Sequence, residues 1–248
     1  MYVTIMSKAS KVLNMAKREH YLIVDTETTI NDRVYDYAAV VTDRKGRIYT
    51  QCAIIVAESR DETLFYRKDL PRGEMWSRQY AEEKRQGYAA MLDAGTRSMA
   101  SVNAINRWLE RARAEYNPML TAYNLAFDMG KCRNTGIDLD MFSNRFCLWG
   151  LSFAMIAKTK EYKQFILDNH YFKPPTKHGN MSYYTNAEKM AEFVAGVTEP
   201  EPHTALEDIT GYELPILKSL VNRKGWKKQT KTKFNWREIQ VKNHFKIA

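Results

Sequence analysis

Residues 21–27, Tyr-Leu-Ile-Val-Asp-Thr-Glu, join a short apolar run to a pair of acids. The apolar and partly β-branched half predicts a buried strand. Side chains alternate between the two faces of a strand, so Asp25 and Glu27 should point to the same side, roughly 6.5–7 Å apart. Two carboxylates held together at the end of a buried strand repel each other and need a cation. An acid pair of this kind is common, however, and by itself it more often marks a strand-end turn.

The chain around this stretch predicts a mixed α/β fold. Residues 33–43 and 47–56 are typical of two strands joined at Gly46 into a hairpin. In residues 101–116 apolar side chains recur at helical spacing, and Asn117-Pro118 ends the pattern. Residues 57–100 are rich in charged residues and predict short helices without a strand. Short strands are expected at 119–123 and 144–148, and a helix at 186–194. This order of elements favours a mixed sheet covered by helices.

Two further polar groups follow predicted elements. Asn124 comes directly after a short strand, where it could cap a helix whose first turn contains Asp128. His203 and Asp208 lie five residues apart at the start of another segment with helical spacing. A lone histidine before a helix is more often a cap or a surface residue. Here the acids of two other segments accompany it.

Together the three groups resemble the motifs of the DEDDh 3′-to-5′ exonucleases, a family that includes the proofreading subunit of bacterial DNA polymerase III and related phage nucleases. The resemblance extends over approximately residues 20–220, with the motifs in the family's order and each on the expected element. Two positions depart from the family pattern. Ile30 stands where many members have Gly, and Tyr123 stands where many have His. Both lie beside the expected nucleotide pocket and therefore bear on substrate preference more than on catalysis.

The resemblance implies a ribonuclease H-like, five-stranded mixed sheet flanked by helices, and a two-metal mechanism. Carboxylates are hard oxygen ligands suited to Mg²⁺ or Mn²⁺, and four of them would balance two divalent ions. In the family pattern His203 is the general base that takes the proton of the attacking water. The implied metal ligands are Asp25, Glu27, Asp128 and Asp208.

The same resemblance places Thr26, Asn124 and Phe127 near the terminal nucleotide. Phe127 could instead be a core residue, and Asn124 could be only a helix cap. The implied activity is release of nucleoside 5′-monophosphates from the 3′ end of single-stranded DNA. Trimming of RNA 3′ ends and non-catalytic binding of nucleic acid are the alternatives, and a polymerase or another replication protein is a conceivable partner.

The charge of the chain is concentrated near its end. The formal net charge of the 248 residues is +9, and the segment from Lys218 onward has ten basic residues and one acid, so it carries the whole surplus. Aromatic residues alternate with these charges, a mixture that can bind phosphates and stack on bases, although the aromatics could also pack back on the body. The aromatic residues of this segment are Trp226, Phe234, Trp236 and Phe245. The lysines that we expect to contact nucleic acid are Lys224, Lys227, Lys228, Lys231 and Lys233.

The domain organisation follows from these patterns: an N-terminal arm at 1–20, an exonuclease domain at 21–217 with a helical insertion at 57–100, and a basic tail at 218–248. The three cysteines are far apart and suggest neither a disulfide framework nor a zinc site. No window approaches the roughly 18 uninterrupted apolar residues of a membrane span. We therefore expect a soluble cytoplasmic protein, located in the host cytoplasm if it is encoded by a phage.

Overall fold

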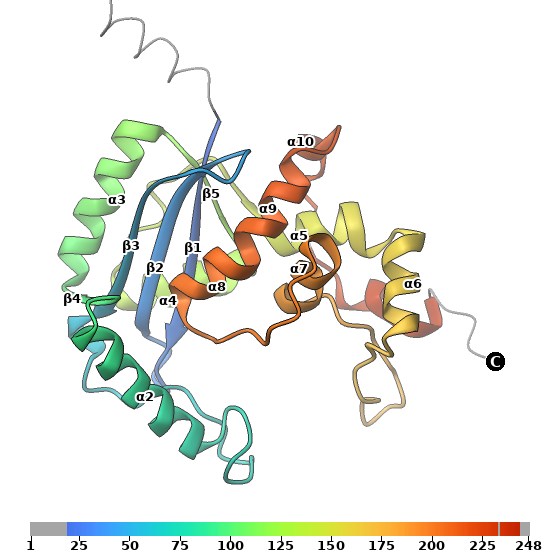
Figure 1. The fold of residues 1–248 in the computed structure, drawn as a ribbon, viewed down its shortest axis with the longest axis horizontal. Helices are drawn as coiled ribbons and strands as arrows, with labels where there is room; N and C mark the ends of the chain where they lie inside the picture. Colours follow the sequence, from blue (N-terminus) through green and yellow to red (C-terminus); the bar gives the residue numbers. More distant parts are fainter. Residues whose placement is uncertain (1–18, 233, 244–248) are drawn as a thin grey trace, which may run out of the picture.

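A computed structural model describes residues 19–232 and 234–243. Within these ranges six strands form one mixed sheet in the order β4-β3-β2-β1-β5-β6 (Figure 1). In the middle of this order β2 is antiparallel to both β1 and β3, and β4, β5 and β6 each join as parallel partners. The strands are β1 (His20–Thr28), β2 (Val34–Asp43), β3 (Ile48–Val56), β4 (Ser98–Ala100), β5 (Met119–Ala122) and β6 (Arg145–Cys147).

The predicted α/β class and the mixed sheet flanked by helices are confirmed. The sheet has one strand more than the five expected, because β4 pairs with the outer edge of β3. Its three residues are too short and too exposed to show strand periodicity. The expectation of short helices in 57–100 was also wrong in part, because one 16-residue helix, α2 (Arg78–Asp93), dominates this segment. The Ser77 side chain accepts a hydrogen bond from the Tyr80 N–H and caps it.

Helices cover both faces of the sheet. On one face, Leu22 and Val24 pack with α3 (Val102–Tyr116) and α4 (Leu125–Thr135). On the other face, Tyr21 and Ile23 pack against a larger group of C-terminal helices. This group contains α5 (Leu148–Ser152), η2 (Phe153–Ala157), α6 (Lys160–Asp168), α7 (Ala187–Ala195), α8 (Ala205–Asp208), η3 (Ile209–Glu213) and α9 (Leu214–Val221). Because alternate β1 residues face opposite layers, Asp25 and Glu27 belong to the face of α8 and η3, and Thr26 to the face of α4.

The C-terminal segment packs on the body. The predicted boundary between residues 217 and 218 falls inside α9. Beyond it, Trp226 at the start of α10 (Trp226–Gln229) is 5% exposed and contacts the Tyr21 and Phe146 rings. Phe234 stacks on Trp149 with ring centroids 3.8 Å apart. The chain continues through η4 (Trp236–Ile239) and η5 (Val241–Asn243). Residues 1–18 of the arm predicted at 1–20, Lys233, the Trp236 side chain and Phe245 lie outside the described residues.

Candidate active site

The C-terminal end of β1 brings Asp25 and Glu27 to one end of the sheet. In Figure 1 this end of β1 lies near α2 and the loop that leads into α8. Both side chains point to the face of α8 and η3, as alternation along β1 requires. Burial raises the pKa of Asp25 well above its usual range, and the neighbouring carboxylates of Glu213, Asp128 and Asp208 raise it further. The first predicted motif is therefore a pair of acids in a strongly negative environment.

Asp128 reaches the same end from α4. The Thr26 hydroxyl donates a 2.9 Å hydrogen bond to Asp128 Oδ1, which ties the second motif to the first. Asp128 is 3% exposed, and burial raises its pKa to about 7 although the Thr26 bond opposes this. Thr26 is thus turned toward α4 and orients an acid.

The third motif extends from His203, two residues before α8, to Asp208, the last residue of this helix. Single ligand atoms of Glu27, His203 and Asp208 all lie within 4.8 Å of one another, a spacing at which they could hold one metal ion. Burial raises the pKa of Asp208 to about 9, with Glu201 and Glu27 adding to the effect. Burial and the nearby Lys84 ammonium lower the pKa of His203 to about 4, so its imidazole is neutral near pH 7. The structure therefore brings all three predicted motifs to one end of the sheet.

The donor set fits a divalent metal. Oδ2 of Asp25 and Oδ1 of Asp208 are buried and have no hydrogen-bond partner among the described residues. Buried carboxylate oxygens without partners are costly, and a hard cation would satisfy them. Carboxylates with one histidine suit Mg²⁺ or Mn²⁺ better than soft metals. The fit rests on Asp25, Glu27, Asp128, His203 and Asp208.

The residues expected near a nucleotide occupy different surroundings. Phe127 is 44% exposed beside Asp128, so it lies on the surface of α4 and not in the core, and the Lys131 ammonium lies 4.8 Å from its ring centroid. Asn124 is exposed at the position before α4, and within the described chain its side chain makes no capping bond. Both side chains are accessible to a ligand, whereas Thr26 is buried.

Lys84 is a neighbour of the site that the sequence analysis missed. Its ammonium forms a 2.7 Å ion pair with Glu27, and both side chains are nearly buried. The same ammonium lies 5.5 Å from the Trp76 ring centroid, and the Trp76 ring contacts that of His203 at 4.8 Å. The segment 57–100 therefore forms one wall of the site. The local sequence pattern of residues 57–100 does not predict these contacts with Glu27 and His203, because they depend on how α2 packs near the end of β1.

A buried ion network supports the third motif and was also missed. The guanidinium of Arg97, just before β4, donates two hydrogen bonds to Asp36, of 2.9 and 3.2 Å. It also pairs with Glu207 on α8, and the Asp36 carboxylate accepts the Ala205 N–H at 3.0 Å. Asp36 lies opposite Glu27 in the β1–β2 register. The network thus fixes the start of α8, which carries Asp208, to the strand beside the first motif.

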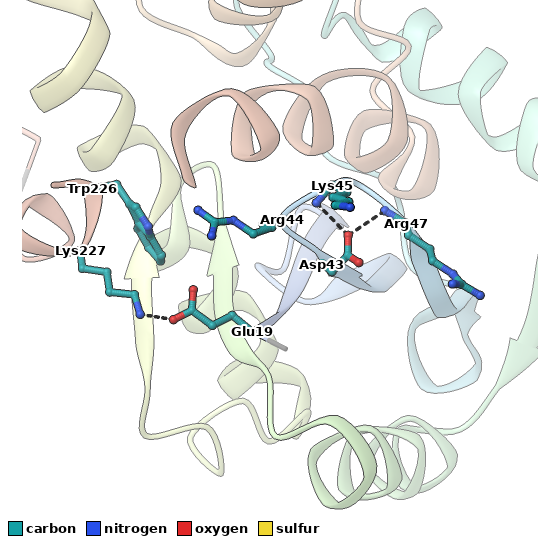
Figure 2. A pocket seen from close by; sticks show the side chains of 7 residues that line it. All are labelled: Glu19, Asp43, Arg44, Lys45, Arg47, Trp226 and Lys227. Carbon is teal, nitrogen blue, oxygen red and sulfur yellow. Dashed lines mark hydrogen bonds and ion pairs between the residues drawn. The ribbon is translucent and has the colours of Figure 1, made fainter. Parts of the chain in front are cut away.

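The basic residues near the C-terminus lie at the other end of β1. A cavity of about 580 Å³ is lined there by Arg44, Lys45 and Arg47 of the β2–β3 turn and by Trp226 and Lys227 of α10, with Glu19 and Asp43 (Figure 2). Lys227 pairs with Glu19, and Asp43 accepts the backbone N–H groups of Lys45 and Arg47 (Figure 2). Lys224, Lys228 and Lys231 are exposed nearby along the chain.

No protein-family model matches the chain, and no curated protein matches it. A solved structure similar to this chain is described as "Exonuclease X in complex with 5′ overhanging duplex DNA". The two are 18% identical, the alignment covers 85% of this chain and 96% of that chain, and the TM-score is 0.40. Among the described residues, no helix is long and apolar enough to cross a membrane.

Proposed function

We propose that this chain is a metal-dependent nuclease that removes nucleoside 5′-monophosphates from the 3′ end of single-stranded DNA. The observation that carries this proposal is the set of carboxylates that three separate segments bring together, two of which, Glu27 and Asp208, lie beside the neutral His203 at a spacing that suits one metal ion. A structural role does not explain acids that raise one another's pKa. A protein that only binds nucleic acid has no use for acids that repel phosphate.

The residues divide the chemistry between them. Asp25, Glu27, Asp128 and Asp208 would hold the metal ions, and Mg²⁺ or Mn²⁺, when bound, would supply positive charge at the phosphodiester and its attacking water. The water oxygen forms a bond to phosphorus while the bond from phosphorus to the 3′ oxygen breaks, and the departing 3′ oxygen takes up a proton from solvent. His203 is neutral near pH 7 and can accept the proton of that water. Phe127 and Asn124 are exposed beside Asp128, where they can contact the terminal nucleotide.

The test uses oligonucleotides of one sequence as DNA and RNA, single- and double-stranded, labelled at either end. We expect single-stranded DNA labelled at its 5′ end to shorten stepwise with Mg²⁺ or Mn²⁺, and EDTA to stop the reaction. Asp128→Ala should abolish cleavage and retain DNA binding. Cleavage in EDTA would overturn the metal mechanism, and a faster reaction on RNA would reassign the substrate. Binding without cleavage of any oligonucleotide would favour the non-catalytic alternative.

A further inference from the structure

Glu213 is a buried acid next to the three motifs and belongs to none of them. It is the last residue of η3 and is 3% exposed. Its Oε1 accepts a 2.9 Å hydrogen bond from the backbone N–H of Tyr123, directly before Asn124. Its Oε2 is buried and has no hydrogen-bond partner within residues 19–232 and 234–243. One oxygen thus fixes the side chain, and the other is left unsatisfied.

The helical geometry of this segment turns Glu213 toward Asp208. In a regular α-helix, at 3.6 residues per turn, a residue five positions further on points about 140° away. Here Ile209–Glu213 is π-helical, and the Leu214 N–H donates to the Ile209 carbonyl five residues earlier. The wider turn moves Glu213 back toward the side of Asp208. Single π-helical turns are rare and frequently occur at functional sites.

Glu213 also interacts electrostatically with the acid of the first motif. After burial, its carboxylate is the group that raises the pKa of Asp25 most, ahead of Asp128, Asp208 and Glu27. Burial raises the pKa of Glu213 itself, followed by the effect of Asp128. Asp25 Oδ2, Asp208 Oδ1 and Glu213 Oε2 are therefore three buried acceptors without partners in the described chain, in carboxylates that act on one another. These three oxygens do not form one group within 4.8 Å of one another, as ligand atoms of Glu27, His203 and Asp208 do among the described residues, so the cation that Glu213 could join is one at Asp25.

We propose that Glu213 is a fifth carboxylate of the divalent-metal site, giving its free oxygen to a cation held with Asp25. This inference rests on the proposed function, because the cation is the Mg²⁺ or Mn²⁺ of the nuclease. It makes the site richer in acids than the three motifs predict. The Tyr123 N–H holds the other oxygen in place and so links Glu213 to the segment that carries Asn124 and Asp128.

Calorimetric titration of the full metal-free chain with MnCl₂ at neutral pH tests the inference. Glu213→Gln keeps the shape and the acceptor for the Tyr123 N–H and removes the charge. We expect it to weaken Mn²⁺ binding about 10- to 100-fold or to lose one bound ion. Asp208→Asn is the positive control. Glu192→Gln is the matched negative control, because Glu192 on α7 pairs with Lys189 and accepts the Tyr171 hydroxyl.

Thermal unfolding gives a second readout. Metal-free Glu213→Gln should be at least as stable as the parent, since a repelled charge has been removed, and Mn²⁺ should raise its Tm by less. Glu213→Ala, which also leaves the Tyr123 N–H unpaired, should show the same loss of Mn²⁺ affinity. Parent-like affinity and stoichiometry in Glu213→Gln would overturn the inference and leave Glu213 as a cap of Tyr123. A parent chain that binds no Mn²⁺ would instead overturn the proposed function.

Discussion

His203 illustrates how a single residue combines position and charge state at this site. Its backbone has a φ of +56°, in the left-handed region, directly before the short helix that carries Asp208. Such a conformation is uncommon for a residue with a β-carbon and persists where surrounding contacts impose it. The Trp76 ring contacts the imidazole, and burial together with Lys84 keeps it neutral. Ring position and protonation state are therefore both influenced by the wall formed by residues 57–100.

Replacing His203 tests its role as the base. We expect His203→Ala to lower the cleavage rate about 10²- to 10⁴-fold, because the attacking water loses its proton acceptor. Rates on a short single-stranded DNA at saturating Mg²⁺ measure this. His178→Ala, at an exposed histidine, is the control and should leave the rate unchanged. A parent-like rate in His203→Ala would remove this residue from the mechanism.

The Lys84 ammonium forms an ion pair with Glu27, one of the proposed metal ligands. It therefore competes with a metal ion for this carboxylate. We expect Lys84→Met to tighten Mn²⁺ binding by roughly tenfold, since a competing and repelling charge is removed from a poorly solvated site. Calorimetric titration measures the affinity. Lys68→Met, at an exposed lysine of the same segment, serves as the control. Weaker Mn²⁺ binding in Lys84→Met would mean that the ammonium helps to assemble the site.

At the scale of elements, helix α8 has four residues, too few to be stable without contacts to the rest of the protein. Arg97 and Asp36 provide these contacts through Glu207 and the Ala205 N–H, and the side chains of Arg97 and Asp36 are fully buried. Removing one partner of a buried ion pair leaves an uncompensated charge, which typically costs about 3–5 kcal/mol. The third motif therefore depends on a residue of the segment 57–100.

Two variants separate the charge of this network from its shape. We expect Arg97→Met to lower the free energy of unfolding by about 3–5 kcal/mol in urea. The double variant Arg97→Met/Asp36→Asn should be more stable than Arg97→Met, because the introduced amide keeps an acceptor for the Ala205 N–H and carries no charge. If the double variant were the less stable of the two, the destabilisation would come from packing and not from the unpaired carboxylate.

The sequence predicts most of the regular elements and little of how they contact one another. Residues 21–27 could be predicted from a continuous apolar run with a polar end, and the helix at 101–116 from a clear helical period with a clear end. The helix forms at Val102–Tyr116 with Asn117 in the left-handed conformation. The three acidic motifs could be recognised because each lies at the end or the start of a predicted element and because together they resemble the motifs of a known family. Lys84, Arg97 and Glu213 could not, because their roles depend on how distant segments cross and, for Glu213, on a π-helical turn that no local pattern announces.

At the scale of the whole molecule, the acid cluster couples metal binding to stability. Asp25, Asp128 and Asp208 have a higher pKa in the folded chain than in the unfolded chain. Their protonated forms therefore favour folding, and this contribution is full below about pH 4 and is lost as the pH rises through about 7 and 9. Metal-free protein should accordingly lose stability on the alkaline side of neutrality.

Thermal unfolding between pH 6 and pH 9 measures this effect. In EDTA we expect the Tm to fall by more than about 5 °C, and in Mg²⁺ or Mn²⁺ the fall should be smaller, because the metal favours the ionised carboxylates. Asp208→Asn should flatten the profile in EDTA. A Tm that rises over this range in EDTA would contradict the raised pKa values.

The two ends of β1 carry opposite charges, and this arrangement predicts how substrate length matters. Asp25 lies six positions after Glu19, which lines the basic cavity, and six positions of extended chain span roughly 20 Å. At about 3.4 Å per nucleotide of a stacked strand, this distance corresponds to about six nucleotides. A strand whose 3′ end lies at the acids could therefore reach the exposed lysines near α10 only if it is longer than that.

Charge substitutions test this reach better than truncation, because Trp226, Ile239 and Val241 are part of the core. We expect Lys228→Gln/Lys231→Gln to weaken binding of a 12-nucleotide single-stranded DNA and to lower its salt slope by about 1.4, at about 0.7 for each phosphate that is no longer neutralised. Cleavage of a trinucleotide should be unchanged. Arg107→Gln/Arg111→Gln on α3, on the other face of the sheet, is the matched control. An unchanged salt slope for the lysine pair, or an equal reduction for the α3 pair, would mean that the strand follows a different path over the surface.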